Sequence, residues 1–104
     1  MNYTKLIDVQ FDQGNGVRFR VLYKSELIRC FIFQNNEFFV KRADGEDFIR
    51  GVQRYEQLIH MAALENIRLN GVSDDPWGNL ITSVDIESMH ADFAANQDAL
   101  RLPS

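Results

Sequence analysis

The sequence predicts an α+β fold: an antiparallel sheet of about four strands, with a long helix packed on one face, followed by a C-terminal amphipathic helix. Apolar and polar residues alternate with a period of two through much of residues 1–43, which is typical of strands. Apolar residues then recur at steps of three and four through residues 44–70, which indicates an amphipathic helix. With 104 residues, 45% of them hydrophobic, we expect a single domain over 1–104.

Residues 1–43 are expected to be mainly strands. Residues 7–12 alternate cleanly, and Gln13-Gly14-Asn15-Gly16 has the composition of a tight hairpin turn. The next strand, 17–23, places Val, Phe and Tyr on one face and mostly basic residues on the other. After a short turn, residues 27–33 are apolar on both sides, as expected for the third strand of a meander that is covered at least partly on both faces.

The polar run after the third strand leaves two alternatives open. Asn35 or Asn36 can cap a helical turn through residues 37–40, or the same apolar residues can form a short fourth strand. The capping chemistry of asparagine favours the helical turn.

The second half of the chain is predicted to be mainly helical. Three carboxylates in the first turn complement the helix dipole at the start of the 44–70 helix, and Gly71 follows its end. A polar loop leads to a short strand at 78–83, and a last helix is expected over 84–101.

The sequence contains, in this order, Val17-Arg18-Phe19-Arg20-Val21, Ile28-Arg29-Cys30, the helix start Glu46-Asp47-Phe48-Ile49, and Leu80-Ile81-Thr82-Ser83. This order of segments resembles a family of short bacterial proteins known as domain of unknown function 1488. The resemblance covers roughly residues 5–86 and implies no catalytic residue, because the family has no established activity.

Charge is distributed unevenly along the chain. The net charge is −4, yet residues 1–43 have a surplus of three positive charges and residues 44–104 a surplus of seven negative charges. This polarity indicates either that the two halves attract each other or that each faces a partner. The single cysteine favours a reducing compartment, and no segment approaches the ~20 apolar residues of a membrane span, so a cytoplasmic protein without a membrane partner is expected.

Candidate reactive residues are better explained as structural. Cys30 lies within an apolar strand, where a cysteine is usually a small core residue, and His60 and His90 have no ligand spacing around them. The acidic residues 44–47 belong to a helix start, and the acidic pair at 74–75 lacks the spacing of a calcium loop. The sequence therefore predicts no catalytic residue, no cofactor and no metal site.

One constellation is a candidate interaction surface. Basic and aromatic residues share the sheet face that is turned away from the long helix. Proteins that bind single-stranded nucleic acid use such a face for phosphate contacts and base stacking. The apolar stripe of the last helix offers a cover for this face, within the chain or from a second copy. The candidate residues are Arg18, Arg20, Arg29, Phe31 and Phe33 on the sheet, and Ile86, Met89 and Phe93 on the helix.

The leading hypothesis is a small non-enzymatic protein that acts through protein contacts, as a homodimer or an adaptor. The alternative is a nucleic-acid-binding module, which an acidic chain with a pI near 5.0 disfavours. A third possibility is that the acidic half imitates nucleic acid and blocks a nucleic-acid-binding protein.

Overall fold

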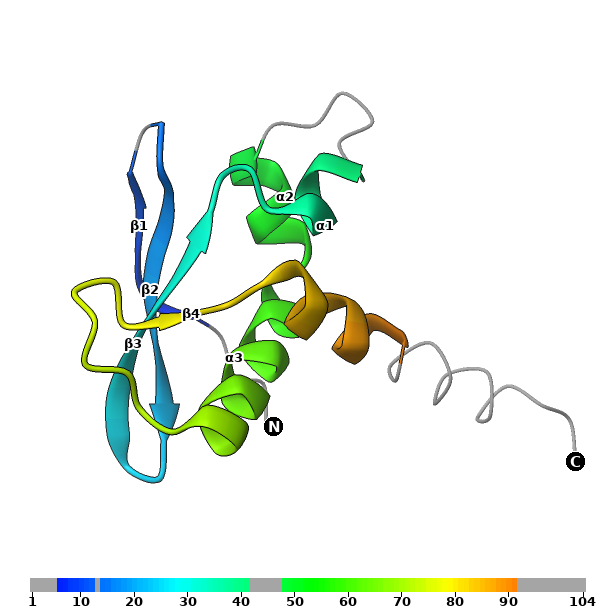
Figure 1. The fold of residues 1–104 in the computed structure, drawn as a ribbon. Helices are drawn as coiled ribbons and strands as arrows, with labels where there is room; N and C mark the ends of the chain where they lie inside the picture. The colour runs from blue at the N-terminus through cyan, green and yellow to red at the C-terminus, as the bar shows by residue number, and fades with distance from the viewer. Residues whose placement is uncertain (1–5, 13, 42–47, 92–104) are drawn as a thin grey trace, which may run out of the picture.

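The computed structural model describes residues 6–12, 14–41 and 48–91 and has an α+β architecture. A four-stranded sheet forms one layer, and the helices lie together on one side of it (Figure 1). The elements are β1 (Ile7–Asp12), β2 (Gly16–Tyr23), β3 (Glu26–Phe33), α1 (Glu37–Lys41), α2 (Phe48–Arg54), α3 (Glu56–Asn70) and β4 (Asn79–Leu80), followed by a final helix whose described part is residues 83–91.

The first three strands form the predicted antiparallel meander. The β1–β2 connection is the expected tight turn, in which Asn15 N donates to Asp12 O at 2.9 Å. The β2–β3 connection is a two-residue turn of Lys24 and Ser25, whose φ angles of 48° and 69° are both positive. A turn with two positive φ angles matches the twist of a β-hairpin, so these two residues define the register of β2 and β3 without a glycine.

The fourth strand is present but differs in direction from the sequence expectation. Cys30 pairs with Asn79 and Phe31 with Leu80 in parallel register, so the sheet is mixed although mostly antiparallel. The physical reason is the connection: the chain crosses from β3 to β4 through three helices on one side of the sheet. Such a crossover brings the next strand back in the same direction.

The region predicted as one helix over 44–70 contains two. Tyr55 separates α2 from α3 with φ −103° and ψ 23°, while residues 44–47 lie outside the described residues. The Tyr55 ring lies edge-on to Phe38, with centroids 5.1 Å apart. The helical alternative for residues 37–40 is correct, because Asn36 caps α1 by accepting from Phe38 N at 2.9 Å.

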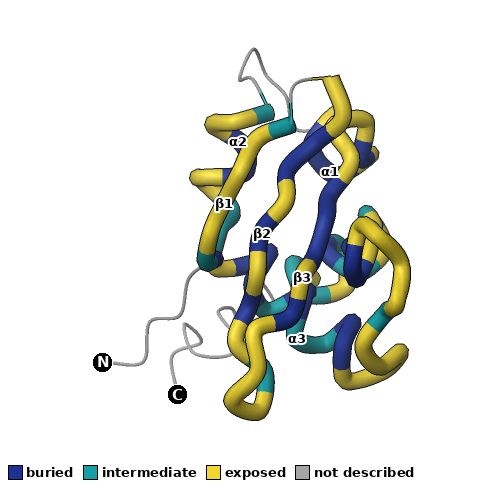
Figure 2. The backbone as a smooth tube through the Cα atoms, turned by 90° about the vertical axis from the view of Figure 1, so that its left-hand side faces the viewer, coloured by how far each residue is buried: buried dark blue, intermediate teal, exposed yellow. Residues whose placement is uncertain are grey.

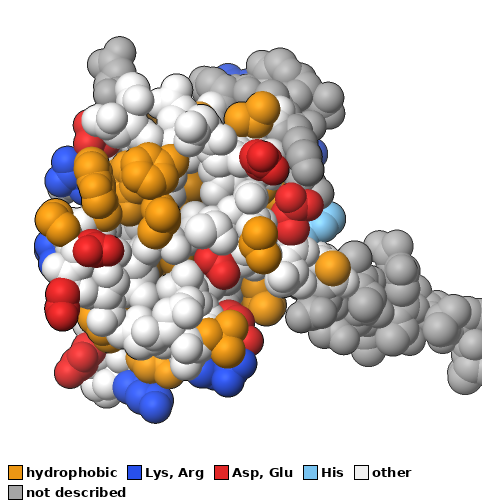
Figure 3. All heavy atoms as spheres, in the orientation of Figure 1, with side chains coloured by type: hydrophobic (Ala, Val, Ile, Leu, Met, Phe, Trp, Pro, Cys, Tyr) orange, Lys and Arg blue, Asp and Glu red, His pale blue; other side chains and the backbone are white. Residues whose placement is uncertain are grey.

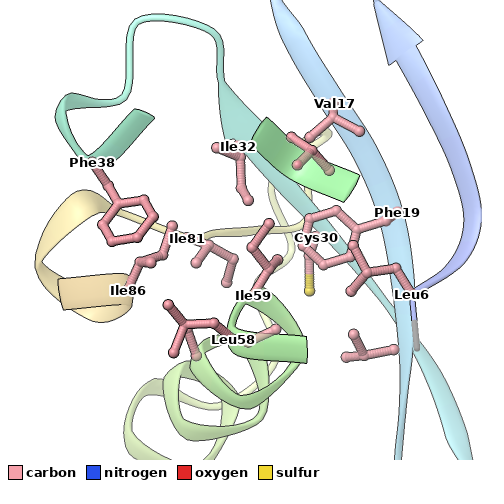
Figure 4. Packing of buried hydrophobic residues seen from close by; sticks show 14 of the residues in the cluster. Leu6, Val17, Phe19, Cys30, Ile32, Phe38, Leu58, Ile59, Ile81 and Ile86 are labelled. Carbon is pink, nitrogen blue, oxygen red and sulfur yellow. The ribbon is translucent and has the colours of Figure 1, made fainter. Parts of the chain in front are cut away.

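The core lies between the sheet and α3. β2 and β3 contribute their inward-facing residues, and α3 contributes the residues of one face (Figure 4). The core residues of β2 and β3 are Val17, Phe19, Val21, Ile28, Cys30 and Ile32. The core residues of α3 are Leu58, Ile59, Ala62, Ala63 and Ile67.

The final helix packs on the inner side of the sheet, together with the other helices. Thr82 and Asp85 form a reciprocal cap: Asp85 N donates to Thr82 Oγ1 at 3.3 Å, and Thr82 N donates to Asp85 Oδ2 at 2.9 Å. Ile86 is fully buried, and its side chain lies near Phe38 and Ile81 (Figure 4). The expectation that this helix covers the outer sheet face is therefore wrong for residues 83–91, and residues 92–101 lie outside the described residues.

A buried asparagine pair anchors the edge of the sheet at β4. Asn79 Nδ2 donates to Asn66 Oδ1 at 3.0 Å and to Gly71 O at 2.8 Å, and Asn79 Oδ1 accepts from Ser73 N at 2.9 Å. Asn66 Nδ2 donates in turn to Leu80 O at 3.1 Å. These bonds fix the end of α3, the following loop and β4 as one unit.

Among the described residues, no helix combines the length and the apolar composition that a membrane span requires.

Candidate interaction surface

The sheet face turned away from the helices is the outer face, and arginines dominate it. Arg18 and Arg20 on β2 and Arg29 on β3 are exposed, because they alternate with the buried residues of the same strands. Figure 2 shows such an alternation of exposed and buried positions along β2. No helix within the described residues lies over this face. The structure thus brings together the three arginines that the sequence singled out.

Two of these arginines oppose each other directly. Arg20 on β2 is the register partner of Arg29 on β3. Like charges at directly opposed positions destabilise a sheet, so an anionic group near the pair stabilises it. Arg20 lies 3.6 Å from Asp8, and Arg18 lies 3.1 Å from Asp12, whereas Arg29 has no ion pair within the described part of the chain.

The arginines surround a hollow of about 250 Å³ on the outer face. Asp8, Gln10, Pro76 and Trp77 also line it, as do Phe19 of β2 and Cys30 of β3. The hollow lies where the β1–β2 register shifts between Ile7 and Gln10, and Asp8 has a φ of 52° there. A bulge of this kind bends a strand locally and re-aims its side chains.

An aromatic cluster of Phe31, Phe33 and Trp77 adjoins the hollow. The Phe31 ring is 4.5 Å from Trp77 and 4.9 Å from Phe33, centroid to centroid. Phe31 is fully buried, but Phe33 is 37% and Trp77 41% exposed. Figure 3 shows hydrophobic side chains gathered at this side of the molecule. The accessible part of the cluster is therefore formed by Phe33 and Trp77.

The loop between α3 and β4 places Trp77 over the outer face. Gly78 has a φ of 79°, and a Cβ built on it would collide with the carbonyl group of Arg29. Only glycine allows the loop backbone to lie this close to β3. Within the described residues it is thus this loop, and not the predicted C-terminal helix, that covers Phe31.

The helix residues of the candidate surface lie elsewhere. Ile86 is part of the core, and Met89 is half-buried against it. Phe93 lies outside the described residues. The structure does not bring Ile86 and Met89 to the arginines, because the sheet separates them.

The candidate reactive residues have structural environments. Burial raises the pKa of the Cys30 thiol to about 12, so the thiol stays protonated at neutral pH. Burial also lowers the pKa of His60, and the nearby Glu56 carboxylate partly opposes this effect. The His90 ring lies edge-on to Phe38 at 5.9 Å.

No group of three or more His, Cys, Asp or Glu side chains that could hold a metal ion occurs among the described residues. Asp74 and Asp75 are exposed, and Asn79, which the sequence places near them, uses its amide for Asn66, Gly71 and Ser73. The acidic residues 44–47 lie outside the described residues.

Trp77 is a member of this surface that the sequence does not predict, since residues 72–78 are expected only to form a polar loop. The available signal was the lone tryptophan of the chain between Pro76 and Gly78, because a large ring beside a flexible glycine is suited to folding back onto a neighbouring surface.

The chain matches no protein-family model, no curated protein and no solved structure at a significant level. The resemblance to domain of unknown function 1488 stays a prediction. Function is therefore inferred from the surface itself.

Proposed function

We propose that the protein is a non-enzymatic binding protein that acts through protein contacts made by its outer sheet face. The observation that carries this proposal is the arrangement of Arg18, Arg20 and Arg29 around a hollow beside the exposed ring of Trp77. Tryptophan and arginine are the residue types most enriched among those that dominate binding energy in protein interfaces. We also propose a cytoplasmic location, which the single cysteine favours.

The geometry supports contact with a protein better than contact with a polyanion. Asp8 and Asp12 already lie beside two of the three arginines, so the surplus positive charge of the face is small. A nucleic acid binds through many phosphates and needs a basic surplus, whereas a protein partner needs only a few well-placed carboxylates and an apolar group.

Site-specific photo-crosslinking in the native cells tests the proposal. A photoreactive amino acid replaces the exposed Gln10, which lines the hollow, in one variant and the exposed Gln57 on α3 in a matched control. Both variants keep the three arginines. We expect protein adducts from position 10 and few from position 57. The absence of adducts at position 10, or equal yields at both positions, would contradict the proposal.

Binding of single-stranded nucleic acid is the second candidate function. It is favoured by the opposed Arg20 and Arg29, which an anion stabilises, and by the exposed rings of Phe33 and Trp77, on which bases can stack. A polarisation assay with single-stranded oligonucleotides over a salt series tests it. Binding that weakens with salt supports this function, and no binding at low ionic strength rules it out.

A further inference from the structure

Both signs of charge flank the aromatic cluster on the outer face. Arg18, Arg20 and Arg29 line the hollow on one side of Trp77. Asp74 and Asp75 precede Trp77 in the same loop and are exposed. In Figure 3 the hydrophobic group has Lys or Arg side chains on one side and Asp or Glu side chains close to it on another.

We infer that the occupant of the outer face is a second copy of this chain, related by a twofold axis that passes close to Trp77. The inference rests on the proposed function and names the partner. In a twofold interface the same patch meets itself, so the patch must be complementary to its own rotated image. A surface whose apolar centre is flanked by Arg29, which has no ion pair in the described part of the chain, and by the exposed Asp74 and Asp75 meets that requirement.

Such a pairing satisfies groups that the single chain leaves exposed. The Trp77 and Phe33 rings of the two copies meet at the centre and lose contact with water. The carboxylates of Asp74 and Asp75 in one copy approach the guanidinium groups of Arg20 and Arg29 in the other. Each contact occurs twice. The pairing therefore reduces, in both copies, the repulsion between Arg20 and Arg29 and the repulsion between the two aspartates.

The net charge of −4 does not prevent this pairing. Salt screens charges that lie further apart than ~8 Å at physiological ionic strength, while pairs that are close and partly desolvated are screened much less. Local complementarity at the interface therefore outweighs the repulsion between the two chains as wholes.

Charge reversal with purified full-length protein tests the inference. The Arg29→Asp and Asp75→Arg variants each place like charges across the interface twice, so we expect each to weaken dimerisation by roughly a hundredfold. An equimolar mixture of the two variants forms a heterodimer in which both contacts again have opposite charges. The double variant Arg29→Asp/Asp75→Arg restores the homodimer for the same reason.

The measurement is molar mass by light scattering during size exclusion, with the monomer at 12.1 kDa. All substituted side chains are exposed, and far-ultraviolet circular dichroism reports folding of each variant, because the emission of Trp77 also changes when the two copies separate. Arg68→Asp on α3 is the matched control, because Arg68 is exposed on the helix side of the sheet, where it pairs with the neighbouring Glu65. This control is expected to stay dimeric.

Three results would overturn the inference. The first is a wild-type protein that is monomeric at millimolar concentration. The second is a dimer that both single reversals leave intact, and the third is a pair of monomeric variants that do not associate when mixed. Cross-linking from position 10 to a different protein, with no dimer, would overturn the second-copy inference and leave the proposed function standing. A dimer without cross-links at position 10 would contradict the proposed function.

Discussion

Replacing Asn79 by alanine removes three hydrogen bonds from one buried side chain. Asn79 is 3% exposed, and its amide holds Asn66 Oδ1, Gly71 O and Ser73 N at distances between 2.8 and 3.0 Å. A typical buried hydrogen bond contributes about 1 kcal/mol net, so the three together contribute about 3 kcal/mol to the free energy of unfolding. For a domain of this size that loss lowers Tm by roughly 10–20 °C.

Thermal and urea unfolding of Asn79→Ala, followed by circular dichroism, measures this loss. The matched control is Asn70→Ala, since Asn70 is an exposed asparagine at the end of α3 and is expected to change stability by less than about 0.5 kcal/mol. If Asn79→Ala were as stable as the control, the asparagine network would not be what anchors β4, and the reasoning would fail.

Three further changes have defined outcomes. Gly78→Ala places a methyl group against the Arg29 carbonyl at a residue with positive φ, so we expect the loop to shift and the free energy of unfolding to fall by roughly 1–3 kcal/mol. The shift exposes Trp77 and moves its emission to longer wavelength; unchanged emission would contradict this. Burial raises the pKa of Cys30 from 9.0 to about 12, so the folded state binds more protons than the unfolded state between these pH values. The contribution of Cys30 to the free energy of unfolding is therefore complete below about pH 9 and falls as pH rises above it. A Cys30→Ala variant whose free energy of unfolding decreased equally with pH in this range would contradict this cause. Ile86→Ala is expected to lower the free energy of unfolding by about 2–5 kcal/mol, because Ile86 is fully buried. The control Val84→Ala changes an exposed side chain and is expected to have little effect. Equal losses for the two variants in chemical denaturation would refute the position of Ile86 in the core.

The sequence predicts the meander well because its signals are local. Alternation along β2 and β3 identifies the buried face, and the glycines around Asn15 mark the first turn. Asn36 is likewise correctly identified as one of two possible caps, because capping depends on a single side chain and the next two backbone groups.

The features that the sequence does not predict depend on contacts between distant segments. A two-residue strand such as Asn79–Leu80 has no pattern that specifies the direction of its partner. The apolar stripe of the final helix fits either face of the sheet, and only the space beside Phe38 and Ile81 places Ile86 on the inner side. The position of Trp77 depends on the close approach of Gly78 to β3, which no local pattern reveals.

The shortest strand is also the passage between the two faces of the sheet. Trp77 lies two residues before Asn79–Leu80, on the arginine side, and the final helix begins three residues after this strand, on the core side. A partner that binds Trp77 would therefore contact the residues directly before the strand from which the final helix continues. A displacement of Asn79–Leu80 would shift both the position of Trp77 and the start of the last described helix.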